Sequence, residues 1–343
     1  MKTIYKRFND LNWDDNIEPL DVSEEEKMDM KNRVTKKIRK SRRVPKVWRN
    51  IAAAAVVTIA SIATIGIGFP TLANQIPIVN NIFALFNDEQ DEFYSKYEEF
   101  ATGIGQVQTS NGITMTVDYA VYDGKTITMT YSVETEKEIG ENIGVNAPVN
   151  VKDEIGGTGT TTALKKVSDT QYVGMVTSTP IFNNKPKEVI VNWEPGSIIN
   201  QDTMNEVKGN WKFNFTLKEV RGDIQTVGQS SAENGVEVWI NEIRSTDIST
   251  VIEYNQKVDT SVLEEWEWVT TDLEVVDNLG NKYRVNSNGG YSEEEQNFYW
   301  SATMQNVDKN AASLIFKPEV VWSKEGKEHQ SFTLDPIEVI LKK

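Results

Sequence analysis

Apolar and polar residues alternate along most of the chain beyond residue 105, and this period of two predicts β-strands. In the segment NGITMTVDYAVYDGKTITMTYSVE, apolar side chains recur at every second position on both sides of Asp123 and Gly124. Successive side chains of a strand point to opposite faces and Asp-Gly favours a tight turn, so the segment predicts a β-hairpin. The same alternation, bounded by turn residues, predicts shorter strands at 171–176, 188–193 and 211–217.

The hairpin pattern occurs twice in the sequence. NGVEVWINEIRSTDISTVIEY, which starts at Asn234, repeats NGITMTVDYAVYDGKTITMTY, which starts at Asn111, at one constant offset. A further hairpin is predicted in LEVVDNLGNKYRV. Two copies of one domain explain this repeat better than one large domain. The chain is therefore predicted to be mainly β, with two immunoglobulin-like β-sandwich domains at 105–222 and 223–343.

A different pattern occupies residues 50–69, where apolar residues follow one another without alternation. The run IAAAAVVTIASIATIGIGF contains only three polar residues and ends before Pro70. A helix of this length crosses the hydrocarbon core of a bilayer, which is about 30 Å thick, so we expect one transmembrane helix here. A signal peptide cleaved after Ala73 is the alternative, but the run begins too far from the N-terminus for such a peptide.

Charge differs on the two sides of this run. Residues 1–49 contain 14 Lys and Arg against 9 Asp and Glu, a net charge of +5, whereas the remainder contains 22 against 42, a net charge of −20. The positive-inside bias places the N-terminus in the cytoplasm and the C-terminal domains outside the cell membrane. The acidic exterior argues against nucleic acid as a direct ligand.

The cytoplasmic segment, residues 1–49, is predicted to form two short helices with apolar stripes. Ser23 and Glu26 form a capping box at the start of the second helix. So few apolar side chains cannot build an independent core, and we expect a protein partner to complete it. A passive tail in contact only with membrane lipid is the alternative. The residues that a partner would cover are Ile4, Tyr5, Phe8, Leu11, Trp13, Met30, Val34 and Ile38.

Residues 70–104 lack strand alternation and are rich in aromatic residues near their C-terminal end. This composition predicts a membrane-proximal helical linker. Its apolar side chains would lie either at the membrane surface or under the outer domain.

The sequence offers little catalytic chemistry. The absence of cysteine excludes disulfides, thiol nucleophiles and thiolate metal sites. His329 is the only histidine and lies in the polar stretch KEGKEHQ, which does not suggest a catalytic triad. We therefore expect no enzyme activity, no cofactor and no metal. Among the outer tryptophans, Trp266 and Trp268 in EEWEWV would share one strand face and are candidates for a surface ligand site.

Four segments form a recognisable combination: the start MKTIYKRFNDLNWDD, the capped helix VSEEEKMDMKNRVTKKIRK, the join WRNIAAAAVV and the post-membrane segment FPTLANQIPIVNNIFALF. Together with NGITMTVDYAVYDG they resemble a family of Gram-positive, membrane-anchored anti-sigma factors. The resemblance implies that the cytoplasmic segment holds an extracytoplasmic-function sigma factor inactive. It also implies that the outer β-domains respond to envelope state, with release possible through a protease. The zinc-binding motif of better-studied anti-sigma factors is absent, so sigma-factor binding would be metal-free.

A membrane-anchored surface protein is the alternative function. Its β-domains would bind a wall polymer or another envelope component, and residues 1–49 would merely flank the membrane helix. The two hypotheses predict different gene neighbours: a sigma-factor gene directly upstream, or genes for wall synthesis or transport.

Overall fold

The computed structural model describes residues 82–87, 92–155, 159–326 and 328–342, which all belong to one compact unit, Ile65–Lys343. Within these ranges the protein is mainly β, with 21 strands and a few short helices. None of the helices there has both the length and the apolar character that a membrane crossing needs. The predicted cytoplasmic segment and the helix predicted at 50–69 lie outside the described residues.

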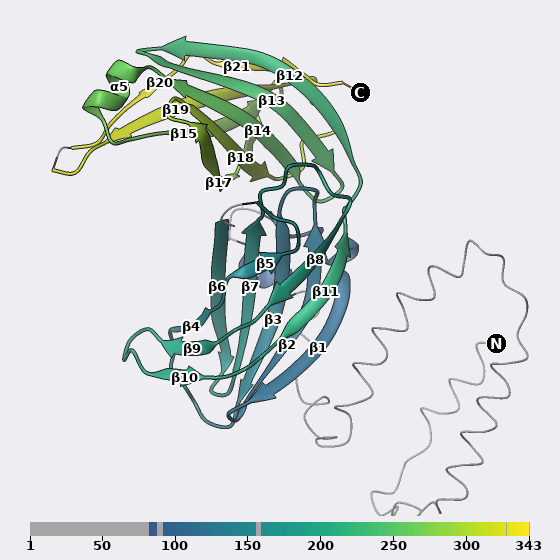
Figure 1. Ribbon diagram of the computed structural model, residues 1–343. Coiled ribbons are helices and arrows are strands. Elements are labelled where there is room, and N and C mark those ends of the chain that lie inside the picture. The colour runs from purple at the N-terminus through teal and green to yellow at the C-terminus, as the bar shows by residue number, and fades with distance from the viewer. Residues whose placement is uncertain (1–81, 88–91, 156–158, 327, 343) are drawn as a thin grey trace, which may run out of the picture. The chain divides into compact units, whose positions relative to one another are not determined.

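The first group of strands, which we call the first sandwich, contains one five-stranded and two three-stranded sheets (Figure 1). The five-stranded sheet is antiparallel, and its order is β1 (Thr102–Ser110), β2 (Ile113–Tyr122), β3 (Ile127–Thr135), β7 (Gln171–Thr179) and β6 (Gly159–Ser168). One small sheet consists of β11 (Phe213–Lys218), β8 (Glu188–Trp193) and β5 (Val149–Val151), and the other of β10 (Glu206–Lys208), β9 (Ser197–Asn200) and β4 (Ile143–Asn146).

The core of the first sandwich forms because one face of each strand is apolar. Ile113, Met115 and Val117 alternate with partly exposed residues along β2 and are buried. At the centre, the Trp193 ring contacts Tyr131 at a centroid distance of 4.9 Å and Phe213 at 5.5 Å. Such tight aromatic packing contributes strongly to the stability of a core that has no disulfides.

The second sandwich comprises the remaining strands and two sheets (Figure 1). Both sheets have five strands, and we call the one with the longer strands the larger sheet. It is antiparallel and has the order β12 (Gly222–Glu233), β13 (Val236–Thr246), β14 (Thr250–Val258), β18 (Asn297–Met304) and β17 (Val285–Glu294). The other sheet has the order β16 (Lys282–Tyr283), β15 (Trp268–Asp277) and β19 (Ser313–Ser323), and β19 also pairs with β20 (Gln330–Thr333) and β21 (Ile337–Ile340). Helix α5 (Thr260–Glu265) precedes β15.

The two sandwiches repeat the same local geometry. Asn111 and Gly112 join β1 to β2 with φ of 51° and 75°, and Asn234 and Gly235 join β12 to β13 with 52° and 77°. These positive values suit Asn-Gly in a tight hairpin turn. The hairpin predicted around Asp123 and Gly124 is confirmed as β2 and β3, and its copy forms β13 and β14.

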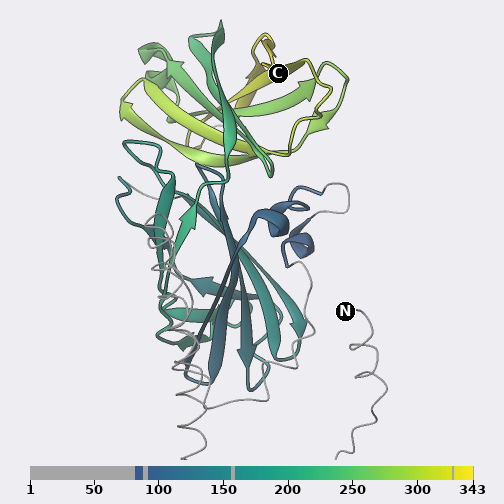
Figure 2. The ribbon, with the colours of Figure 1, turned by 90° about the vertical axis from the view of Figure 1, so that its right-hand side faces the viewer.

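The segment before β1 packs on the first sandwich. It contains the 3₁₀ helix η2 (Phe83–Phe86) and the short helix α4 (Tyr97–Phe100), which lie beside the five-stranded sheet in Figure 2. Phe83 and Tyr97 are buried in a cluster with Val121, Val173 and Met175 of that sheet. Of the two environments predicted for the described part of this linker, packing under the outer domain is therefore the one observed.

Candidate functional site

The equivalent hairpin turns of the two sandwiches meet each other. Asp123 begins the β2–β3 turn, and its Oδ1 accepts hydrogen bonds from the backbone N–H groups of Lys125 (2.9 Å) and Thr126 (2.7 Å). Its Oδ2 accepts a hydrogen bond of 3.1 Å from Ser249 Oγ, in the β13–β14 turn. Thr246 takes the place of Asp123 in that second turn, where its Oγ1 accepts from the Ser249 N–H at 3.0 Å. We call this contact region the joint.

A largely buried ion pair lies in the joint. Arg244 Nη1 is 2.9 Å from Glu219 Oε1, and the two side chains are 6% and 14% exposed. Glu219 belongs to the three-residue linker, 219–221, between β11 and β12. Gly124 lies directly under the guanidinium, since a Cβ there would be 2.9 Å from Arg244 Nη1. Burial raises the pKa of Asp123, while its hydrogen bonds and the charge of Arg244 oppose that shift.

The segment before β1 reaches the same joint. Ile248 of the second turn belongs to the apolar cluster around Phe83 and Tyr97. Burial, and then the nearby charge of Asp123, raise the pKa of the Tyr97 hydroxyl well above its usual value. One continuous packing cluster therefore joins the described part of the segment before β1 to both sandwiches.

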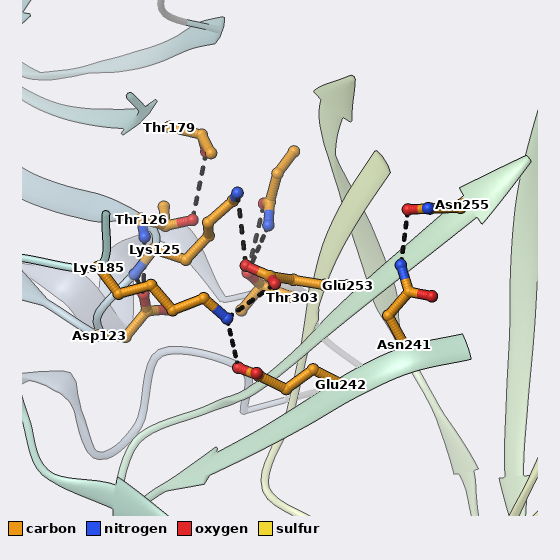
Figure 3. A network of polar contacts seen from close by, with 11 residues as sticks. Asp123, Lys125, Thr126, Thr179, Lys185, Asn241, Glu242, Glu253, Asn255 and Thr303 are labelled. Carbon is orange, nitrogen blue, oxygen red and sulfur yellow. Dashed lines mark hydrogen bonds and ion pairs between the residues drawn. The ribbon is translucent and has the colours of Figure 1, made fainter. Parts of the chain in front are cut away.

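Next to the joint, two lysines of the first sandwich contact two glutamates of the second (Figure 3). Lys185 Nζ lies 2.7 Å from Glu242 Oε1 and 2.9 Å from Glu253 Oε2, and Lys125 Nζ lies 3.5 Å from Glu253 Oε1. Burial opposes ionisation of Glu253, but the two lysines outweigh it and hold the pKa of Glu253 below its usual value. The four charges balance one another.

These ion pairs border a cleft of about 270 Å³ between the β7–β8 loop and the larger sheet of the second sandwich. Amide and hydroxyl side chains form a large part of its lining: Thr179, Asn183, Asn184, Asn241, Asn255, Asn288, Tyr291, Tyr299 and Ser301. Asn241 Nδ2 donates to Asn255 Oδ1 at 2.6 Å, as Figure 3 shows. The rings of Tyr291 and Tyr299 are stacked, with centroids 5.1 Å apart and an angle of 17° between their planes.

The outer face of the larger sheet differs between the two copies. In the first sandwich this face carries Val121, Val173 and Met175, and the segment before β1 covers it. By strand register, Arg244, Tyr299 and Ser301 occupy the corresponding positions in the second sandwich. This face of the sheet is thus apolar and covered by the segment before β1 in the first sandwich. In the second sandwich it is polar and lies next to the cleft.

The structure separates the two tryptophans that the sequence placed on one surface. Trp266 is only 5% exposed, and its ring packs against Trp322 at a centroid distance of 5.7 Å in the core of the second sandwich. Trp268 is 67% exposed at the start of β15. Helix α5 ends at Glu265, so Trp266 lies at the helix end rather than within the strand. The expectation of a shared strand face was wrong for Trp266.

The other candidate residues give no assembled site. His329 is exposed in the loop before β20, as its polar surroundings predicted. No group of three or more His, Asp or Glu side chains is placed to hold a metal ion within the described ranges. The eight residues proposed for partner binding lie outside those ranges: Ile4, Tyr5, Phe8, Leu11, Trp13, Met30, Val34 and Ile38.

Sequence reasoning missed both the joint and the cleft. The internal repeat contained a signal for them, since Arg244 and Glu253 stand where the first copy has Val121 and Thr130. A charged residue at a position that is apolar or neutral in the other copy indicates a face with a different environment. Reading the repeat position by position would have pointed to this surface.

Comparisons with known proteins place the chain among its relatives. Residues 42–135 match the family described as Domain of unknown function (DUF4179), and residues 222–341 match the Family of unknown function (DUF5643). No curated protein matches the chain. A solved structure, "The crystal structure of the conserved domain protein from Bacillus anthracis", is 31% identical and has a TM-score of 0.72. The match covers 78% of this chain and 100% of that one. The chain therefore belongs to the same family as the conserved domain protein from Bacillus anthracis.

Proposed function

We propose that the protein is a membrane-tethered anti-sigma factor. Its cytoplasmic segment, residues 1–49, binds an extracytoplasmic-function sigma factor through apolar stripes, and its outer sandwiches respond to the state of the envelope. DUF4179 is a domain of unknown function that is commonly found in anti-sigma-factor-like proteins, which supports this proposal. The proposal includes a single membrane helix at 50–69, a cytoplasmic N-terminus, and the immunoglobulin-like class of domains 105–222 and 223–343.

The observation that carries the proposal is the packing of the segment before β1 into the joint. Ile248 of the β13–β14 turn packs in the cluster around Phe83 and Tyr97, and the next residue, Ser249, donates to Asp123. A change in the contact between the sandwiches would therefore alter the packing of the segment that follows the predicted membrane helix. That is the connection a receptor needs between an outer event and a cytoplasmic partner.

A pull-down of the tagged full chain from detergent-solubilised membranes of its host tests the proposal. We expect one sigma factor to be recovered, and the combined substitutions Phe8→Ala, Leu11→Ala and Trp13→Ala to remove it. Trp268→Ala, at an exposed position of the second sandwich, is the matched control and should leave recovery unchanged. Recovery of no sigma factor by the unaltered chain would refute the proposal.

A surface-binding protein remains the second candidate, because the cleft between the sandwiches offers a set of polar groups that a ligand would need. It differs from the first candidate in one measurable way. Substitutions in the cleft would reduce attachment of an envelope component without changing transcription. A reporter of the sigma factor's target promoter, read in the same strains, separates the two candidates.

A further inference from the structure

We propose that the cleft between the β7–β8 loop and the second sandwich binds a neutral saccharide. The saccharide would be the envelope signal of the proposed function, and in that respect the inference rests on that function. Binding of the saccharide itself requires no sigma factor. The argument uses the charge balance of the cleft, its hydrogen-bonding groups, its aromatic pair and the contrast between the two copies of the sheet.

Charge balance indicates a neutral ligand. Lys125 and Lys185 are each within 3.5 Å of a carboxylate oxygen, and Glu242 and Glu253 supply those oxygens. An anionic or cationic ligand would have to displace one of these pairs and leave a partly buried charge without its partner, which is costly. A neutral ligand leaves all four charges compensated.

The hydrogen-bonding groups of the cleft fit hydroxyl groups. Asn183 and Asn184 come from the β7–β8 loop, and Asn241, Asn255 and Asn288 come from the second sandwich. Asn241 donates to Asn255 and Asn288 pairs with Thr303, but an amide has two N–H groups and two carbonyl lone pairs, so the array retains donors and acceptors for adjacent sugar hydroxyls. A volume of about 270 Å³ is just below the usual range of ligand pockets, about 300–1,000 Å³, which restricts the ligand to a short saccharide.

Two aromatic rings complete this environment. Tyr291 and Tyr299 lie on the neighbouring strands β17 and β18 and pair directly in the register. Tyrosine combines an apolar ring with a polar hydroxyl, and the C–H face of a sugar ring packs against such a surface. The ring pair, together with Ile181, Phe182 and Trp300 of the same lining, therefore supplies apolar contact beside the amide groups.

The internal repeat gives an independent reason to treat this face as a binding surface. In the first sandwich the corresponding face is covered by the chain's own segment before β1, through apolar contacts. In the second sandwich the corresponding residues Tyr299 and Ser301 line the cleft. Because the walls come from both sandwiches, a saccharide bound there would favour the arrangement in which they contact each other.

Titration calorimetry on the full chain tests the inference. The detergent is lauryldimethylamine oxide, because sugar-based detergents would compete, and the probes are N,N′-diacetylchitobiose and cellobiose. We expect at least one of these neutral disaccharides to bind with a dissociation constant of about 1 mM or tighter. Glucose 6-phosphate, the charged probe, should not bind. Cosedimentation with insoluble chitin then distinguishes a polymeric source of the sugar from a free one.

Variants locate the binding in the cleft. Asn255→Ala and Tyr299→Ala should each weaken binding by about tenfold or more through lost hydrogen bonds and ring contact. Asn184→Ala, in an exposed loop position where folding is not at risk, should weaken it as well. Asn310→Ala, at an exposed position outside the cleft lining, is the matched control and should bind like the unaltered chain.

Three results would overturn the inference: no binding of either neutral disaccharide at 10 mM (roughly ten times the expected dissociation constant), tighter binding of the charged probe, or unchanged binding in all three cleft variants. The pull-down of the sigma factor is read separately on the same preparation. Failure of saccharide binding with a recovered sigma factor leaves the proposed function standing, and the reverse result leaves the cleft inference standing.

Discussion

Asp118 and Asn241 show how one position acquires different chemistry in the two copies. Each is the extra residue of a β-bulge, between Val117 and Tyr119 in one copy and between Ile240 and Glu242 in the other. Asn241 donates to Asn255 at 2.6 Å, whereas Asp118 has only Ser132 at 3.4 Å. Burial raises the pKa of Asp118 to about 7, and Ser132 only partly opposes this.

Replacement of Asp118 with Asn should therefore stabilise the protein in a pH-dependent way. The folded state favours the protonated carboxyl group of Asp118. The stability that this protonated group contributes is fully present below pH 3.8 and is lost as pH rises through about 7. Asp118→Asn should raise the free energy of unfolding by roughly 1–3 kcal/mol at alkaline pH and by almost nothing in acid. Denaturant titration at several pH values measures this, with Asp223→Asn at an exposed position as control.

Arg244 provides a second prediction at the residue scale. Arg244→Met removes the partner of Glu219 and a charge that acts on Asp123, and it leaves the Asp123 carboxyl group buried and that of Glu219 largely buried. Loss of one partner of such a pair costs about 3–5 kcal/mol. Lys317→Met breaks the exposed pair with Glu274 and should cost less than about 1 kcal/mol. Equal losses in thermal or denaturant unfolding of the two variants would contradict the importance of the joint.

Among the elements, the segment before β1 is stabilised by side-chain packing more than by its own secondary structure. Its helices contain only four residues each, which is too short for independent stability. Phe83→Ala empties a fully buried position and should lower the free energy of unfolding by about 3–5 kcal/mol. Lys96→Ala, on the exposed side of the same segment, is the control. Increased proteolysis between residues 92 and 101 in Phe83→Ala, but not in the control, would confirm that packing holds the segment.

Local patterns predicted some elements well and others not at all. The β2–β3 hairpin and strand β8 were predicted because alternation and turn residues are contiguous in the sequence. Strand β12 is mostly exposed and polar, so it carries no alternation to recognise. The short strands β4 and β5 depend on pairing with partners far along the chain, which no local pattern reveals.

At the scale of the whole molecule, acid should weaken the contact between the sandwiches. The pKa of Glu253 is lowered in the folded state. The stabilisation that Glu253 gives to the contact between the sandwiches is therefore present above pH 4.5 and is lost as pH falls through the folded-state pKa. The chain has no cysteine, so Met204→Cys and Trp268→Cys, at two exposed sites, would accept spin labels specifically. We expect the distance distribution between the labels to broaden in acid.

Two further variants identify the group responsible. Glu253→Gln should already show the broad distribution near neutral pH and little further change in acid. Glu274 also has a lowered pKa, owing first to Lys317, but its partners lie in the same sandwich. Glu274→Gln should leave the distribution between the labels unaltered at every pH, and a broadening there would contradict the assignment to Glu253.

The repeat could indicate a distinct surface, but the residue pairs of the joint were beyond sequence-based prediction. Ser249 and Asp123 are 126 residues apart in the sequence. Arg244, in β13, and Glu219, in the linker between β11 and β12, are 25 residues apart. Charge and apolar patterning describe what a segment needs, but they do not identify which distant surface provides it. The repeat supplied the two hairpins, and only their mutual contact in three dimensions revealed the site.

The three-residue linker between β11 and β12 has a consequence for the strength of the joint. A short tether holds the two halves at a high effective concentration, so closing the joint costs little translational entropy and needs no diffusional encounter. Contacts that would be too weak to hold two independent proteins together can then keep the joint closed most of the time. Small energies, such as the protonation of one carboxylate or the binding of one sugar, are enough to shift such an equilibrium.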